Sequence, residues 1–70
     1  MDELTAAALL DFEARWGRHT GAKELAIMDE LGMRTARYYQ LLARAARSLE
    51  GIAHDPMTCR RVRGDTAAAA

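Results

Sequence analysis

Residues 21–42 read GAKELAIMDELGMRTARYYQLL, and this stretch decides the fold. Its apolar positions recur three or four residues apart on both sides of Gly32, a pattern typical of two amphipathic helices. Glycine readily adopts the left-handed conformation that ends a helix, so Gly32 predicts a tight turn between them. The inward positions are all apolar or aromatic, namely Ile27, Leu31, Met33, Tyr38 and Leu41. Two helices joined by such a turn have the outline of a helix-turn-helix.

The first of the two helices is predicted to run to about Leu31, with Gly21 as its cap and Glu24 placed to reach back to that cap. Its expected core face consists of Ala22, Ala26, Ile27 and Leu31. Two apolar residues fit neither face clearly, Leu25 and Met28. Met28 stands where this motif normally has a small residue, so we expect a wider gap between the helices or a rotated first helix.

The second helix is predicted to begin near Thr35 and to have one buried and one polar side. Its buried side consists of Tyr38, Leu41, Leu42, Ala45 and Leu49. In DNA-binding proteins of this kind, the N-terminal part of the second helix meets base edges in the major groove. The outward residues there are Arg34, Thr35, Ala36, Tyr39 and Gln40. Arginine pairs with guanine, glutamine with adenine, and methyl groups touch thymine, so these residues are candidates for base contacts.

Three more arginines lie on the polar side, Arg37, Arg44 and Arg47. We expect them to contact phosphates, which determines salt dependence and position on the duplex but not sequence preference. Tyr39 follows the inward Tyr38 and is expected to face out, where an aromatic ring in a basic neighbourhood favours a ligand contact. The same spacing also fits any three-helix domain with a solvated charged face, so spacing alone leaves both interpretations open.

A further helix is predicted on each side of this pair. The earlier one runs from Ala6 to about Trp16, with Thr5 as its cap and Gly17 at its end. Leu9, Phe12 and Trp16 form its buried stripe, and its charged residues Asp11, Glu13 and Arg15 are expected to point elsewhere.

The later helix begins with Asp55 as cap and Pro56 in the first helical position, and it ends near Arg63. We therefore predict an all-α fold, a three-helix helix-turn-helix domain with a short fourth C-terminal helix, over residues 1–63. Residues 64–70 are predicted to be a disordered Ala-rich tail.

Charge is balanced overall but divided along the chain. The 70 residues carry 10 Lys and Arg and 10 Asp and Glu, so the formal net charge is zero. Residues 1–31 hold seven acids and three bases, whereas residues 32–70 hold seven arginines and three acids. Such asymmetry indicates a charged binding face in the second half.

Other signals argue against catalysis and against a cofactor. His19 and His54 lie far apart, Cys59 has no Cys or His partner nearby, and no general base is placed to activate it, so we expect neither a metal site nor an enzyme. The single cysteine excludes an intramolecular disulfide, and no signal peptide or membrane span is evident. A cytoplasmic protein without membrane contact is the expectation.

Two segments resemble a known family, Arg-Tyr-Tyr-Gln at residues 37–40 and Asp-Pro-Met at residues 55–57. Over roughly residues 4–63 the chain is similar to small actinobacterial and mycobacteriophage proteins of unknown function that are described as carrying a helix-turn-helix domain. The resemblance implies that fold and DNA binding. It differs at Arg34, where a serine cap would be typical, so Thr35 is expected to cap the second helix, and its C-terminal basic stretch is shorter.

The leading interpretation is a helix-turn-helix protein, a transcriptional regulator or phage accessory factor, that binds double-stranded DNA. Because one such module covers few base pairs, a homodimer is expected, with Leu10, Leu25 and Met28 as candidate contacts. The alternative is an adaptor or inhibitor of host machinery that uses the same Arg and Tyr face to bind an acidic protein surface.

Overall fold

The computed structural model describes the backbone of residues 4–69 and the side chains of residues 4–64. Its elements, in chain order, are α1 (Ala6–Trp16), α2 (Gly21–Ala26), the π-helical turn η1 (Ile27–Leu31), α3 (Thr35–Ala45), α4 (Leu49–His54) and α5 (Pro56–Ala69). Within this described part every regular element is helical, which confirms the predicted all-α fold.

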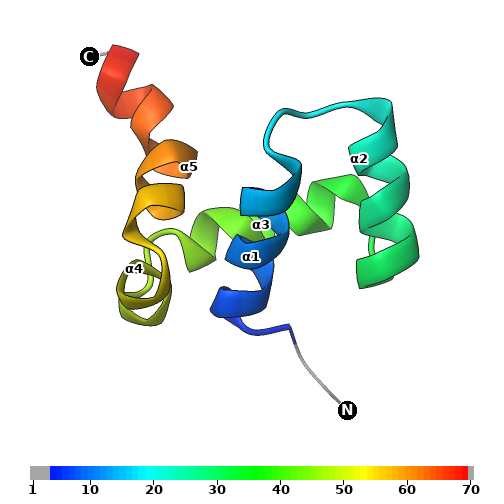
Figure 1. The fold of residues 1–70 in the computed structure, drawn as a ribbon, viewed down its shortest axis with the longest axis horizontal. Helices are drawn as coiled ribbons and strands as arrows, with labels where there is room; N and C mark the ends of the chain where they lie inside the picture. Colours follow the sequence, from blue (N-terminus) through cyan, green and yellow to red (C-terminus); the bar gives the residue numbers. More distant parts are fainter. Residues whose placement is uncertain (1–3, 70) are drawn as a thin grey trace.

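Helix α3 is the central element of the molecule (Figure 1). It passes behind α1, with α2 and η1 near its first end and α4 and α5 at its last end. Helix α3 contacts α1, η1, α4 and α5, so helices from both ends of the chain meet on it. The α-carbon atoms span 33 × 27 × 18 Å.

Helix α1 has the predicted boundaries. The Thr5 hydroxyl accepts a hydrogen bond from the Ala8 amide at 3.0 Å, which satisfies a free N–H of the first turn. Gly17 ends the helix at φ 64°, and its N–H donates to the Glu13 carbonyl. Leu9 and Phe12 are buried as expected, and Trp16 is partly buried and stacks on Phe12.

Helix α2 begins differently from the prediction. Thr20 is the cap, because its hydroxyl can accept from the Lys23 amide, at 3.1 Å, whereas glycine offers no side-chain acceptor. Gly21 is therefore the first helical residue, and Glu24 contacts His19 instead of the cap. Ala22, expected in the core, is exposed. The predicted end is confirmed, since Gly32 is left-handed at φ 66° and ψ 31°.

The predicted second helix of the pair ends earlier than Leu49, and a helix that the prediction omitted follows it. Ser48 separates α3 from the next helix. Its hydroxyl donates to the Ala45 carbonyl at 2.8 Å and accepts from the Gly51 amide at 2.9 Å. A serine that bonds local backbone favours a helix start over a helix interior. Leu49, expected in the core, is instead 87% exposed as the first residue of α4.

Helix α5 starts as predicted, with the Asp55 carboxylate accepting from the Thr58 amide at 3.0 Å. It continues to Ala69, beyond the expected end near Arg63. The predicted disordered tail comprises residues 64–70: the backbone of residues 64–69 lies within α5, whereas residue 70 and the side chains of residues 65–69 lie outside the described part of the molecule. That expectation stays a prediction.

The hydrophobic core draws on α1, α2, η1, α3, the residue after α3, and α5. Its buried apolar members are Leu9, Leu10, Phe12, Ala26, Ile27, Tyr38, Leu42, Ala45, Ala46 and Cys59. Leu10 is fully buried and so is unavailable for the dimer contact expected of it.

Candidate nucleic-acid interface

The outer side of α3 and the turn that follows it carry a row of exposed residues. Arg37, Gln40, Arg44 and Arg47 recur three or four positions apart, with the small residues Ala36 and Ala43 among them. We call these six residues the arginine face. The buried residues Tyr38, Leu42 and Ala45 hold the opposite side of the helix in the core, so packing fixes the direction in which the arginine face points.

Among the described residues, no carboxylate forms an ion pair with the arginine face. Helix α3 contains no acidic residue. Among the described residues, the four ion pairs join Arg15 to Glu30, His19 to Glu24, Lys23 to Glu13 and His54 to Asp11, and none includes Arg37, Arg44 or Arg47. Their guanidinium groups are therefore exposed without an internal partner in the described part, and positive charge concentrates on one helix side.

The start of α3 lies next to this face. Arg34 is the exposed cap residue, and its side chain makes no cap hydrogen bond. Thr35, expected as the cap, is the first helical residue and is partly buried, because the chain after Gly32 and Met33 reaches the cap position one residue earlier. The first amides of α3 thus have no side-chain acceptor, an arrangement that favours anions.

Tyr39 does not face fully outward as expected. It is partly buried, and its hydroxyl lies 2.8 Å from Nδ1 of His19, in the segment before α2. Its ring packs edge-on against Tyr38, with centroids 4.9 Å apart. Tyr39 therefore links α3 to the chain between α1 and α2, and the expected free aromatic surface is reduced.

Met28, expected to crowd the space between the two helices, is 57% exposed. It lies in η1, whose wider π-helical turn changes the direction of the residues that follow Ala26. Ile27 is fully buried, as predicted. The bulky Met28 is thus accommodated by a local change from α-helix in α2 to π-helix in η1.

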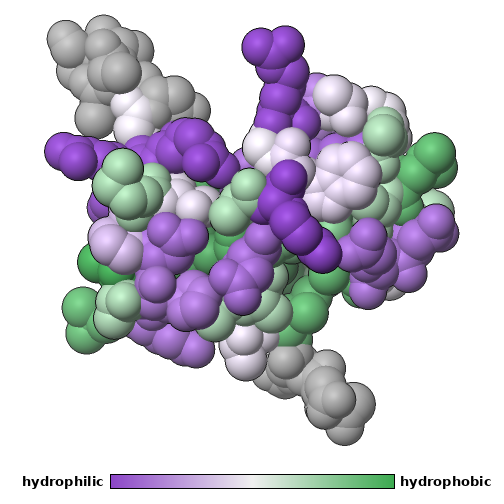
Figure 2. All heavy atoms as spheres, in the orientation of Figure 1, coloured by the Kyte–Doolittle hydropathy of each residue, from purple (hydrophilic) through white to green (hydrophobic). Residues whose placement is uncertain are grey.

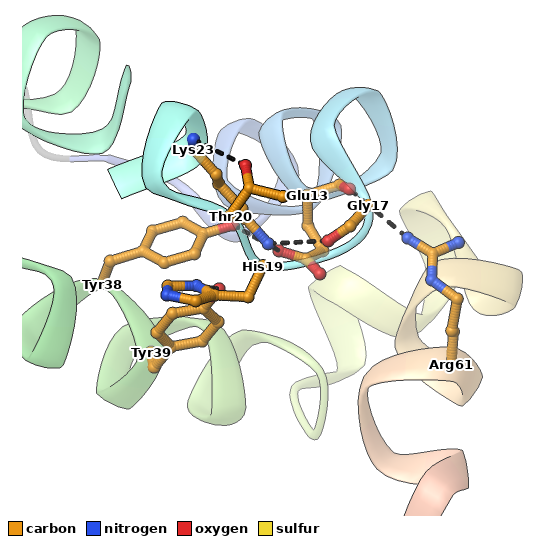
Figure 3. Close-up of polar contacts among 8 residues, drawn as sticks. All are labelled: Glu13, Gly17, His19, Thr20, Lys23, Tyr38, Tyr39 and Arg61. Atoms are coloured by element: carbon orange, nitrogen blue, oxygen red, sulfur yellow. Dashed lines mark hydrogen bonds and ion pairs between the residues drawn. The ribbon is translucent and has the colours of Figure 1, made fainter. Parts of the chain in front are cut away.

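A buried ion pair and one tyrosine hydroxyl join three helices (Figure 3). Lys23 of α2 donates to Oε1 of Glu13 in α1 at 2.6 Å and to the Gly17 carbonyl at 2.9 Å. The Tyr38 hydroxyl of α3 donates to the same Glu13 oxygen at 2.7 Å. We call Glu13, Lys23 and Tyr38 the buried triad. It fixes α1, α2 and α3 relative to one another.

The prediction that Glu13 points away from the core is wrong, and Lys23 was not expected there. The spacing contained a signal for both. Glu13 lies four residues after Leu9 and one after Phe12, and Lys23 lies four before Ile27, so each falls within a core stripe. Each is buried because it meets the opposite charge, which a pattern of apolar residues does not reveal.

The triad keeps Tyr38 protonated. Burial raises the pKa of its hydroxyl far above the usual range, and the hydrogen bond to the Glu13 carboxylate raises it further. Tyr38 is therefore a permanent hydrogen-bond donor to Glu13.

A cavity of about 240 Å³ lies beside the triad, lined by Glu13, Tyr39, Leu42, Arg61 and Val62. The Arg61 side chain reaches across from α5 and donates to the Glu13 carbonyl at 3.4 Å (Figure 3). The volume of this cavity is below the roughly 300–1,000 Å³ of sites that bind drug-sized ligands. An extended surface is therefore a better candidate site than this cavity.

The described residues show no metal-binding cluster, and burial works against a reactive Cys59. No three or more His, Cys, Asp or Glu side chains there are grouped to hold a metal ion. Cys59 is buried, and burial raises the pKa of its thiol, which disfavours the reactive thiolate. None of the described helices is both long and apolar enough to cross a membrane.

Comparison with known proteins gives one match. No curated protein and no solved structure is significantly similar to this chain. A family described as "Protein of unknown function (DUF3263)" matches residues 3–68, nearly the whole sequence. By that match, the chain belongs to the DUF3263 family of proteins of unknown function.

Proposed function

We propose that this protein is a helix-turn-helix DNA-binding protein that inserts the first half of α3 into the major groove. The arginine face carries the proposal: it lies on the second helix of a pair joined through a left-handed Gly32, and no described carboxylate pairs with its arginines. Duplex DNA is a dense array of negative charge, and a helix of this kind fits its major groove.

Within this proposal the exposed residues have two roles. Arg34 and Gln40 contact base edges near the start of α3, and the Thr35 methyl reaches a thymine where its partial exposure allows. Arg37, Arg44 and Arg47 contact phosphates, together with the free amides at the helix start. Tyr39 positions α3 through His19, and its contact with DNA is limited to its exposed edge.

The biological role that follows is a transcriptional regulator or a phage accessory factor. An adaptor that binds an acidic protein surface would use the same arginine face. The two differ in one measurable property, because only a DNA-reading protein discriminates between duplex sequences.

The test is a fluorescence anisotropy titration of random and selected duplexes at two salt concentrations. Arg44→Ala and Arg47→Ala are expected to weaken binding to all duplexes alike and to lower the slope of log K against log salt by about 1. Gln40→Ala is expected to cost about 1–3 kcal/mol at one position of the selected site and to relax the preference there.

Arg18→Ala is the matched control, since Arg18 is exposed in the segment after α1 and lies outside the arginine face. It should leave both the slope and the preference unchanged. The DNA proposal fails if the parent binds no duplex more tightly than about 100 μM near physiological salt. It also fails if Arg18→Ala reduces binding as much as Arg44→Ala does.

A further inference from the structure

Large apolar side chains are exposed at both ends of the longest axis of the molecule. At one end, Leu25 in α2 and Met28 in η1 are 67% and 57% exposed. At the other end, Leu49 in α4 and Met57 in α5 are 87% and 69% exposed. Figure 2 shows apolar surface at both edges of the view, over α2 and over α4. These four are the large apolar side chains of the described residues that are exposed to this degree.

Each pair of exposed large side chains has an exposed alanine near it on the same helical segment. Ala22, Leu25 and Met28 follow one another at intervals of three, and we call them the α2 patch. Leu49 and Ala53 lie one turn apart on α4, and with Met57 they form the α4 patch. Contiguous exposed apolar surface on a small domain marks an interaction site more often than single exposed residues do.

The two patches carry opposite charges at their margins. Asp29 lies four positions after Leu25, is exposed, and forms no ion pair with a described residue. Arg60 lies three positions after Met57, and it too is exposed without such a pair. Arg47 and Glu50 flank Leu49 with opposite charges that offset each other. Asp55, two positions before Met57, is engaged as the cap of α5 through the Thr58 amide. The free charge at the margin is therefore Asp29 for the α2 patch and Arg60 for the α4 patch.

From this complementarity we infer that the chain associates with itself head to tail, the α2 patch of one copy against the α4 patch of the next. Such an interface covers both apolar patches and brings Asp29 toward Arg60. A symmetric pair built on one patch would bring like charges together and leave the other patch in water. Head-to-tail interfaces do not close into a dimer by themselves, so the expected product is a growing chain or a ring.

The consequence for the proposed DNA-binding role is multivalency. All of the arginine face except Arg47 lies on α3, which contributes none of the residues of either patch, so each associated copy keeps that part of the face free. Arg47 lies two residues before Leu49 and borders the α4 patch. Several linked faces bind a polyanion more tightly than one face does. The association itself requires no nucleic acid, so its test is independent of the DNA proposal.

The experiment is sedimentation velocity of the whole chain without DNA, at protein concentrations from about 10 μM to 1 mM, where weak contacts populate. The parent is expected to show a mean mass that rises with concentration and exceeds that of a dimer. Leu25→Glu and Leu49→Glu should each sediment as a monomer. Both positions are exposed, so the substitutions leave the core intact, and circular dichroism checks the fold.

Mixing the two variants provides the decisive result. Leu25→Glu keeps an intact α4 patch and Leu49→Glu keeps an intact α2 patch, so an equimolar mixture should form dimers and nothing larger. Ala14→Glu adds the same charge at an exposed position of α1 outside both patches, and it should associate as the parent does.

Charge exchange tests the margins in the same assay. Asp29→Arg and Arg60→Asp should each weaken association about twofold to fivefold, the range of an exposed ion pair, and the double variant should recover it. The inference is overturned by a parent that remains monomeric throughout or by a mixture of the two glutamate variants that stays monomeric. It is equally overturned if only one of those variants abolishes association, because that result means a symmetric contact.

Discussion

Lys23 and Glu13 show how a single pair of residues specifies this small fold. Removing two charges from water is costly, and the cost is offset only when every polar atom finds a partner. Oε1 of Glu13 accepts from both Lys23 and Tyr38, and the described residues contain no buried side-chain nitrogen or oxygen atom without a hydrogen bond. The pair selects one arrangement of α1, α2 and α3, because any other would leave a charge unpaired.

Removing one member of this pair should therefore be worse than removing both. Lys23→Met leaves the Glu13 carboxylate buried beside Tyr38 and is expected to lower the free energy of unfolding by about 3–5 kcal/mol. Adding Glu13→Gln to that variant should recover at least half of the loss, measured by urea denaturation. Losses that simply add in the double variant would show that the two residues act independently.

His54 and Asp11 tie α4 to α1 through a hydrogen bond of 2.8 Å. That bond raises the pKa of His54 above its ordinary 6.5. The protonated form is thus favoured in the folded protein, so the bond contributes stability below pH 6.5 that is lost as the pH rises through the folded pKa. We expect the melting temperature of the parent to fall relative to that of His54→Gln as the pH rises from about 6 to 8. Parallel melting curves across this range would exclude a folded-state contribution from His54.

At the scale of the elements, the junction between α3 and α4 depends on two small residues. Ser48 caps α4, and Ser48→Ala should cost about 1 kcal/mol of stability. Gly51 packs its backbone against the end of α3, and a Cβ added there would overlap the carbonyl oxygen of Ala45.

Gly51→Ala should therefore destabilise the protein more than Ser48→Ala does, since a backbone atom cannot move aside as a flexible side chain can. Gly21→Ala is the matched control: its added Cβ meets no atom within 4 Å, and alanine favours the helix. Thermal melts of the three variants should rank Gly21→Ala as most stable and Gly51→Ala as least. A Gly51→Ala variant as stable as the parent would mean that α4 does not pack closely on α3.

Helix α3 has two roles within eleven residues. Its inner side packs in the hydrophobic core, and its outer side carries most of the arginine face. Tyr39 links α3 to the segment between α1 and α2 through His19. Tyr39→Phe removes that hydrogen bond and should cost about 0.5–1.5 kcal/mol of stability in denaturation experiments. Its effect on DNA affinity should be smaller than that of Arg44→Ala, and a larger effect would assign Tyr39 a direct contact.

For the whole molecule, the sequence was sufficient at several helix ends that local chemistry decides, although the caps at Thr20 and Ser48 were missed. The cap at Thr5, the left-handed Gly32 and the Asp55–Pro56 start all act within a few residues and were predicted. The buried triad was missed, because Glu13 and Lys23 enter the core only through a contact between distant helices. The break at Ser48 was missed because the apolar spacing runs on to Leu49, although Ser48 followed by Gly51 is a local signal for a new helix.

For the candidate site too, some residue positions could be predicted from the sequence and others could not. The exposure of Arg34, Arg37, Gln40, Arg44 and Arg47 follows from helical periodicity and was predicted. The positions of Thr35 and Tyr39 depend on where the cap falls and on the approach of His19, which periodicity does not specify.

The most direct test of the account is to locate bound DNA on the molecule by ¹H–¹⁵N NMR. A duplex of about two helical turns is titrated into the labelled protein at low salt. The account predicts that amides from Arg34 to Gln40 shift first, that those in the first half of α1 do not shift, and that the shifts diminish as salt is added. Shifts confined to α2 and η1, or no shifts at low salt, would contradict it.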